Sequence, residues 1–176
     1  MKFFQHFGEY LLFLKAVFTK PEKGKIFFKQ IITESNNIGV GSFAIISLIS
    51  GFIGAVSTIQ IGYQLVSGIL PDYLIGRIVR DSNILEFAPT VTALVLAGKV
   101  GSNIASEIGT MKVTEQVDAL EIMGINAANY TSLAKIIAGV FSIPMLVLYA
   151  MILSLIGGAV TGWASGIISV DRVVKG

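Results

Sequence analysis

The stretch IGVGSFAIISLISGFIGAVSTIQIGYQLVSGILP, residues 38 to 71, contains no charged side chain and decides the fold class of this chain. At a rise of about 1.5 Å per helical residue, about 20 apolar residues cross the hydrocarbon core of a membrane. The stretch is long enough for one tilted helix and too short for two helices with a turn. We place the first membrane span near residues 39 to 66, and its many glycines and serines indicate close contacts with other helices.

The composition of the whole chain also indicates a membrane protein. Of its 176 residues, 53% are hydrophobic and only 14% are charged, with a mean hydropathy of +0.77, whereas ordinary soluble domains are about 25% charged. The net charge of +2 gives no reason to expect a nucleic-acid partner. With no cysteine and a single histidine, His6, the sequence predicts neither a metal site nor a catalytic triad.

Two further apolar stretches predict two more spans. The second covers residues 87 to 106, and the third covers residues 136 to 160 and then passes into a loop. Residues 72 to 86 predict a short polar connection between spans one and two, in which one amphipathic turn of helix can form. Residues 1 to 30 mix aromatic side chains with lysines, which is typical of an amphipathic helix lying in the membrane interface. The predicted fold class is therefore all-α integral membrane, with about three spans in a single domain of residues 1 to 176.

The lysines predict the orientation of these spans. They are grouped before the first span and between the second and third, and such an excess marks the cytoplasmic side of a membrane. We therefore expect a cytoplasmic N-terminus.

A face of small residues runs along the second span with helical period. Such a face lets two helix backbones approach closely in lipid. The pattern favours packing within the bundle of this chain, and a helix that slides or lines a transport path is the alternative. The expected packing residues are Gly98, Gly101, Ser102, Ala105 and Gly109.

Two charged residues of the second span are candidate functional residues. Lys99 would cost about 2.5–3.5 kcal/mol at the bilayer centre, which favours a side chain that reaches toward the cytoplasmic interface. A polar role of Lys99 inside an assembly is the alternative. Glu86 marks the opposite end of the same span, which favours a position in the membrane interface. The alternative is a functional role, because an acidic residue beside a cavity in a membrane is a functional candidate by default.

The residues KVTEQVDALEIMGIN, 112 to 126, predict a short helix between spans two and three. We expect Thr114 as its N-cap and Gly124 as the residue that follows its end. A helix of residues 114 to 123 reaches only about 15 Å and cannot cross a membrane. One face is apolar and the opposite face is acidic, which suits an anionic lipid surface poorly. A soluble protein that accepts this helix is the expected partner.

Residues 86 to 125, EFAPTVTALVLAGKVGSNIASEIGTMKVTEQVDALEIMGI, resemble the signature of the MlaE permease family. The resemblance rests on Glu86 and Pro89, on LAGKVGS at 96 to 102 and on EIGTMKVTEQVDALEIMG at 107 to 124. Members are membrane subunits of ABC transporters that move phospholipid or related lipids together with MCE-domain proteins. The resemblance implies a permease homodimer in the bacterial inner membrane. Its implied partners are an ABC ATP-binding subunit, an MCE-domain lipid-binding protein and membrane lipid.

The resemblance also implies roles for individual residues. Glu86, Pro89 and Lys99 become candidates for the lipid pathway between spans one and two. Leu85 stands where many members have a basic residue, so a headgroup role at that position does not carry over. Members continue through further spans, and we therefore expect this chain to be a fragment or a truncated form. The helix of residues 114 to 123 would couple to the ATPase through Thr114, Glu115, Gln116, Val117, Asp118, Leu120, Glu121 and Met123.

No motif of this chain predicts ATP hydrolysis. AGKVGS, residues 97 to 102, lacks the first glycine of a phosphate-binding loop, and Val100 replaces the Ser or Thr that binds Mg²⁺. We expect a non-enzymatic subunit without a cofactor, with ATP and Mg²⁺ on a partner. A stand-alone channel or secondary transporter is disfavoured because spans one and three carry no ionisable residue. A structural membrane scaffold is the remaining alternative.

Overall fold

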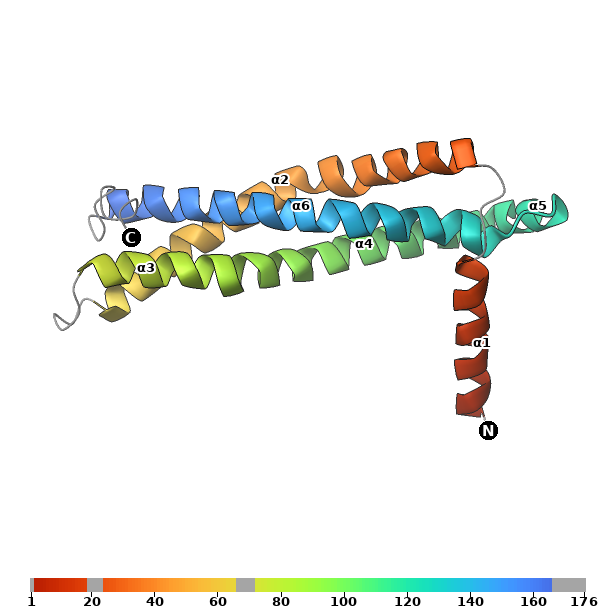
Figure 1. The fold of residues 1–176 in the computed structure, drawn as a ribbon, viewed down its shortest axis with the longest axis horizontal. Helices are drawn as coiled ribbons and strands as arrows, with labels where there is room; N and C mark the ends of the chain where they lie inside the picture. Colours follow the sequence, from red (N-terminus) through yellow and green to blue (C-terminus); the bar gives the residue numbers. More distant parts are fainter. Residues whose placement is uncertain (1, 19–23, 66–71, 166–176) are drawn as a thin grey trace. The chain divides into compact units, whose positions relative to one another are not determined.

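The structure is a computed structural model that describes residues 2 to 18, 24 to 65 and 72 to 165 (Figure 1). Within these residues the chain forms helices joined by turns, so the predicted all-α fold is confirmed. The helices are α1 (Lys2–Val17), α2 (Gly24–Leu65), α3 (Asp72–Ser82), the π-helical turn η1 (Asn83–Phe87), α4 (Ala88–Val113), α5 (Gln116–Ile122) and α6 (Ala127–Ala164).

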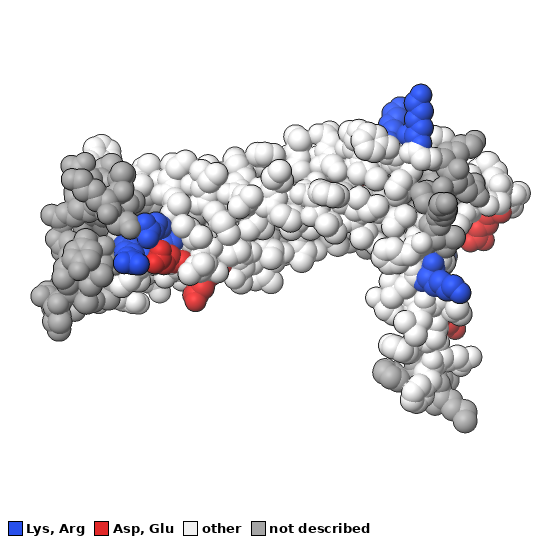
Figure 2. Space-filling model, viewed as in Figure 1, with Lys and Arg blue, Asp and Glu red and all other residues white. Residues whose placement is uncertain are grey.

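Three helical stretches are long and apolar enough to cross a membrane, as predicted. They are Gly24–Gln64, Gly76–Val113 and Ala127–Ala164. On the face shown in Figure 2, charged side chains of the described residues lie near the helix ends, and the surface between them is uncharged. Because a charged side chain in the bilayer centre is costly, this distribution fits an integral membrane protein.

The helices extend beyond the predicted spans. α2 begins at Gly24, well before residue 39, and α6 covers Ala127–Ala164, where we expected residues 136 to 160 followed by a loop. Residues 24 to 30, predicted as part of the interfacial segment, belong to α2; residue 66, the predicted end of span one, lies outside the described residues. Hydropathy locates the part of a helix that suits lipid, whereas backbone hydrogen bonds continue a helix into polar surroundings.

The chain forms two compact units, and α2, α4 and α6 each contribute to both. Unit 1 comprises residues 1 to 41 and 99 to 142, and unit 2 comprises residues 42 to 98 and 143 to 176. The apolar core of unit 2 is formed by four buried side chains on α2, α4 and α6, which are Ile46, Leu96, Leu146 and Ala150. Beside it, the ring of Tyr149 contacts the ring of Phe43 in a tilted arrangement, with 4.6 Å between the ring centres. The Tyr149 hydroxyl shares a 2.7 Å hydrogen bond with the Ser47 hydroxyl.

The backbones of α2 and α6 are in direct contact within unit 2. A Cβ atom at Gly54 would overlap the carbonyl of Ser154, and one at Gly157 would overlap the carbonyl of Gly51. Only glycine fits where two helices approach this closely, and such contacts drive helix association in lipid. The prediction of close helix contacts in the first span is thus confirmed at Gly54, whereas Gly51 contributes its carbonyl to the contact and has open space at its own Cβ position.

In unit 1, the end of α1 is fastened to the start of α6. Asn126 Nδ2 donates to the Ala16 carbonyl at 3.0 Å, and Asn129 Nδ2 donates to the Val17 carbonyl at 2.7 Å. The last carbonyls of a helix have no N–H partner within the helix, so these two asparagines cap α1. Val17 itself is buried at this contact.

The small-residue face of the second span is exposed. Apart from its own helix backbone, no described atom lies within 4 Å of a Cβ built at any of its three glycines. The favoured interpretation, packing against another helix of this chain, is therefore wrong for the described residues. Packing against another chain stays a prediction. The exposed residues are Gly98, Gly101, Ser102, Ala105 and Gly109.

Candidate functional site

The segment between spans one and two is a helix with one π-helical turn. We predicted a polar connection at residues 72 to 86, but α3 passes through η1 directly into α4. The backbone N–H of Ala88 bonds to the Asn83 carbonyl, five residues earlier, as in a π-helix. A single π-turn inserts one extra residue into a helix and turns the side chains after it toward a different direction, which is why such turns are frequent at functional sites.

Asn83 forms a buried polar hub in unit 2. Its Oδ1 accepts hydrogen bonds from the Ser57 hydroxyl of α2 at 2.9 Å and from the Ser154 hydroxyl of α6 at 3.1 Å. Its Nδ2 donates to the Val79 carbonyl of α3 at 3.0 Å. The side chain is 1% exposed, so all three helices meet at one satisfied amide. We did not single out Asn83 in the sequence because it lies in a polar stretch and its partners are far away along the chain.

A substitution of Asn83 tests this hub. Asn83→Leu keeps the volume but removes the acceptor of two buried hydroxyls, and we expect a loss of about 1–3 kcal/mol of stability. The Ser57 hydroxyl also donates to the Gly54 carbonyl at 3.1 Å, so it keeps an acceptor in this variant. Most of the lost stability therefore comes from the Ser154 hydroxyl, which loses its bond to Asn83. Thermal unfolding in detergent measures the change. The triple variant Asn83→Leu, Ser57→Ala, Ser154→Ala should recover stability because it removes both hydroxyls that donate to Asn83, so that neither is left unpaired. An equally unstable triple variant would refute the hub.

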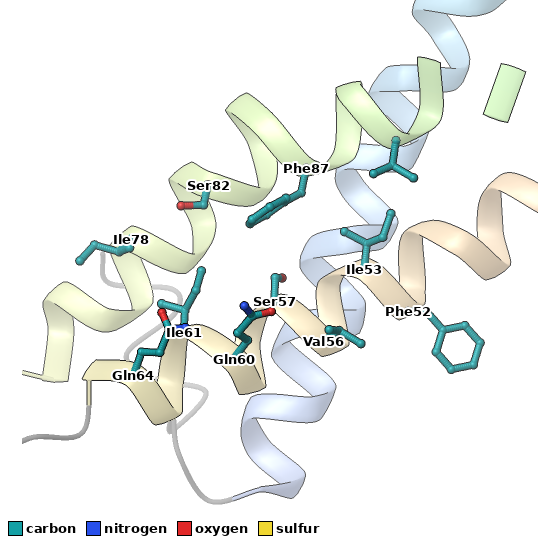
Figure 3. A pocket seen from close by; sticks show the side chains of 11 residues that line it. Phe52, Ile53, Val56, Ser57, Gln60, Ile61, Gln64, Ile78, Ser82 and Phe87 are labelled. Carbon is teal, nitrogen blue, oxygen red and sulfur yellow. The ribbon is translucent and has the colours of Figure 1, made fainter. Parts of the chain in front are cut away.

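A partly open cavity of about 610 Å³ lies beside this hub in unit 2. Its walls come from α2 on one side and from α3, η1 and the start of α4 on the other. Figure 3 shows Ile78, Ser82 and Phe87 on the side opposite α2. The lining residues are Phe52, Ile53, Val56, Ser57, Gln60, Ile61, Gln64, Ile78, Ser82, Phe87 and Val91.

The lining of this cavity is suited to an amphiphilic molecule. Most of the wall is aliphatic or aromatic, and its polar groups are two hydroxyls and two carboxamides, all uncharged. Ligand pockets of this size are lined mainly by apolar side chains, with a few polar groups that orient the ligand. The cavity can therefore hold hydrocarbon chains and offer hydrogen bonds to ester or hydroxyl groups.

The predicted lipid-pathway residues lie outside this lining. Glu86 is exposed on η1, and Pro89 is half-buried in the first turn of α4. Lys99 is half-buried, and its Nζ donates to the Gly41 carbonyl of α2 within unit 1. The lysine thus takes a polar role between two helices. Contact of Glu86, Pro89 or Lys99 with lipid stays a prediction.

The short helix between spans two and three is present as α5, but it begins later than predicted. Thr114 is not its N-cap: α4 continues to Val113, and the Thr114 hydroxyl donates back to the Thr110 carbonyl at 2.7 Å. The cap position is held by Glu115, whose φ of 57° is left-handed and whose side chain makes no capping bond. A threonine hydroxyl can satisfy its own preceding turn, and that bond competes with capping.

The end of α5 is as predicted. Gly124 has a φ of 77°, a left-handed conformation that glycine adopts without a Cβ clash. Its N–H bonds to the Glu121 carbonyl at 2.9 Å, and the N–H of Ile125 bonds to the Leu120 carbonyl at 3.0 Å. This pair of bonds is the Schellman arrangement that ends a helix.

The apolar face of α5 is only partly covered in the described chain. Val117 and Leu120 are half-buried, whereas Met123, directly after the helix, is 65% exposed. Two more apolar side chains near this face are exposed, Val113 at the end of α4 (84%) and Ile122 on the acidic side of α5 (87%). The remaining predicted residues of this helix, Glu115, Gln116, Asp118 and Glu121, are exposed as well. Exposed apolar side chains beside an acidic face are typical of a surface that binds another protein.

A partly buried ion cluster joins three helices of unit 1 near α5. Lys135 Nζ on α6 lies 2.9 Å from Glu34 Oε1 on α2 and 2.6 Å from Glu107 Oε2 on α4. The exposed fractions of these side chains are 4% for Lys135, 12% for Glu34 and 50% for Glu107. In the sequence, Lys135 is one of the lysines between spans two and three that predict the cytoplasmic side, and Glu107 is part of the motif that carries the family resemblance. Glu34 gives no signal because its partner is 101 residues away.

The comparisons with known proteins agree on one family. A family model described as Permease MlaE matches residues 31–174. The intermembrane phospholipid transport system permease protein MlaE of Haemophilus influenzae is 35% identical over 162 residues, which cover 91% of this chain and 61% of the relative. A probable ABC transporter permease protein of Rickettsia bellii is 34% identical over 158 residues, covering 90% and 61% of the two chains.

A plant relative extends the comparison. The chloroplastic protein TRIGALACTOSYLDIACYLGLYCEROL 1 of Arabidopsis thaliana is 30% identical over 152 residues, covering 86% of this chain and 43% of the relative. The chain spans 61% of the length of the two bacterial relatives. The family model covers most of the chain, including most of the first helix that is long enough to cross a membrane and all of the other two. The chain therefore belongs to the MlaE family of permeases.

Proposed function

We propose that this chain is the membrane part of an ABC transporter that moves phospholipid or a related lipid between membranes, without catalytic activity of its own. The apolar cavity between α2 and the α3–α4 helix is the observation that carries the proposal, because it offers a lipid a site with uncharged polar groups. The name of the Haemophilus influenzae relative, an intermembrane phospholipid transport permease, supports the same substrate class. A structural scaffold would have no use for such a cavity.

The energy for transport comes from another subunit in this proposal. An ATP-binding subunit, which carries ATP and Mg²⁺, binds α5 through the exposed apolar residues and the acidic face of that helix. The charge pattern supports a cytoplasmic position for α5 and for the N-terminus in the inner membrane, because lysines flank these segments. A second permease copy and an MCE-domain lipid-binding protein complete the proposed assembly.

Filling the cavity tests the substrate site. Ile61→Trp places a large ring in the cavity, and we expect the complete transporter complex to lose about tenfold or more of its ATP-dependent phospholipid transfer between vesicles, because lipid is excluded from its site. Mass spectrometry of the purified complex should show correspondingly less bound phospholipid.

The control for this variant is Ile45→Trp. Ile45 also lies on α2 and is 42% exposed, but it does not line the cavity. This control should transfer and retain phospholipid like the unchanged complex, and both variants should keep the same amount of ATP-binding subunit. Equal lipid content and equal transfer in the two tryptophan variants would overturn the assignment of the cavity.

A further inference from the structure

We propose that Lys135 is a positioning residue for transport, which ties α2 to α4 and α6 so that a displacement of α5 also moves α2. The inference rests on the proposed function, in which α5 receives the motion of an ATPase. Its basis is the ion cluster of Lys135 with Glu34 and Glu107. In the described chain this cluster connects the three long helices of unit 1 through one side chain.

The position of the cluster along the chain places it next to α5 on both sides. Glu107 precedes the end of α4 at Val113, and Lys135 follows the start of α6 at Ala127. At a rise of about 1.5 Å per residue, the two positions lie roughly 9 Å and 12 Å along their helices from the ends that flank α5. A force on α5 therefore reaches the cluster through two helices at once. Through Glu34 the force then acts on α2, a helix that is not next to α5 in the sequence.

The packing of unit 1 gives this connection its importance. Among the described residues, only Val17 in unit 1 is a large side chain below 2% exposure, whereas unit 2 has Ile46 and Leu96 at its core and the glycine contacts of α2 with α6. In unit 1, α2 is connected to other helices by polar contacts. Besides the ion cluster, Gln30 Nε2 on α2 donates a hydrogen bond to the Tyr130 carbonyl on α6 at 2.9 Å. Among the described residues, Lys135 is the side chain whose ion pairs bring opposite charges together on all three helices.

Buried charges make such a contact stiff. Separating Lys135 from its carboxylates would leave a lysine that is 4% exposed without a counter-charge, and a buried unpaired charge is far costlier than a strained helix contact. Sliding α2 against α4 and α6 is thus opposed at this level, and the three helices move together. Apolar contacts, by contrast, are non-directional and allow small displacements.

Neutralising the whole cluster separates this role from a role in folding. Lys135→Met alone leaves the carboxylate of Glu34 buried and unpaired, so we expect a low yield of folded complex. The triple variant Lys135→Met, Glu34→Met, Glu107→Gln removes all three charges and places apolar side chains at the two buried positions. Replacement of a buried ion cluster by apolar residues of similar volume is often neutral for stability. The triple variant therefore folds without the ionic connection.

The measurement is the amount of phospholipid transferred per ATP hydrolysed by the complete complex in vesicles. We expect the triple variant to assemble with its partners and to melt at the same temperature. Its ATP hydrolysis should continue, but lipid transferred per ATP should fall about fivefold or more, in the usual range of coupling between sites. The control variant Lys25→Met, Glu9→Gln removes an exposed cation and an exposed carboxylate and should keep the ratio unchanged.

Three outcomes would overturn the inference, and one of them would also overturn the proposed function. If the triple variant folds and transfers as much lipid per ATP as the unchanged complex, the cluster is only a folding element and the inference is overturned. If the unchanged complex hydrolyses ATP and transfers no phospholipid, the proposed function fails and the inference falls with it. A triple variant that assembles poorly, although no charge is left unpaired, would also overturn the inference, because the cluster would then be needed for folding.

Discussion

Replacing Gly54 by valine is expected to disrupt the packing of α2 against α6 and to lower the stability of the permease by about 3 kcal/mol, the upper end of the usual overpacking cost. A side chain at this position meets the backbone carbonyl of Ser154, which cannot rotate away as a side chain could. The two helices must therefore separate. Thermal unfolding of the purified protein in detergent, followed by size-exclusion chromatography, measures the loss.

Gly51→Val is the matched control for this prediction. Gly51 lies on the same helix one turn earlier, and a Cβ there meets no atom within 4 Å outside its own helix. Both substitutions change helix propensity in the same favourable direction, because glycine is among the poorest helix formers. Gly51→Val should therefore leave stability unchanged or slightly raised. Similar melting temperatures for the two variants would show that α2 and α6 do not pack as described.

Reversing the charges of Glu115 and Asp118 to lysine is expected to weaken association with the ATP-binding subunit by about 30-fold, or roughly 2 kcal/mol. Both side chains are exposed on the acidic face of α5, so the change converts complementary charge into repulsion. Lysine at position 115 adopts the left-handed backbone no worse than glutamate, and the fold should not change. Co-purification at several salt concentrations measures the effect, which should shrink as salt screens the charges.

The control for the charge reversal is Glu9→Lys. Glu9 is an exposed carboxylate on α1, away in sequence from α5, and the substitution makes the same change of charge as each single reversal. It should leave association unchanged, while Glu115→Lys and Asp118→Lys each weaken it in part. Unchanged association and unchanged transport in the double variant would count against α5 as the coupling element.

Local patterns predicted local features well. The uncharged stretch of residues 38 to 71 predicted a membrane helix, and Gly124 predicted the end of α5, because hydropathy and glycine conformation act within one segment. The resemblance of residues 86 to 125 predicted the family that the comparisons confirm. Thr114 shows where local patterns fail to predict the structure. Its hydroxyl could cap the start of α5 or donate back to the preceding turn of α4, and it donates to the Thr110 carbonyl of α4.

The sequence by itself determined that this chain is a helical membrane protein with three long apolar helices, a short two-faced helix and glycines for close packing. Tertiary structure alone decided which polar groups meet. Asn83 is 71 residues from Ser154, and Lys135 is 101 residues from Glu34. A buried polar group must find a partner, but nothing along the chain specifies which one, since many distant groups could satisfy it. Only the packed arrangement of each unit selects the partner, and with it the cavity and the ion cluster.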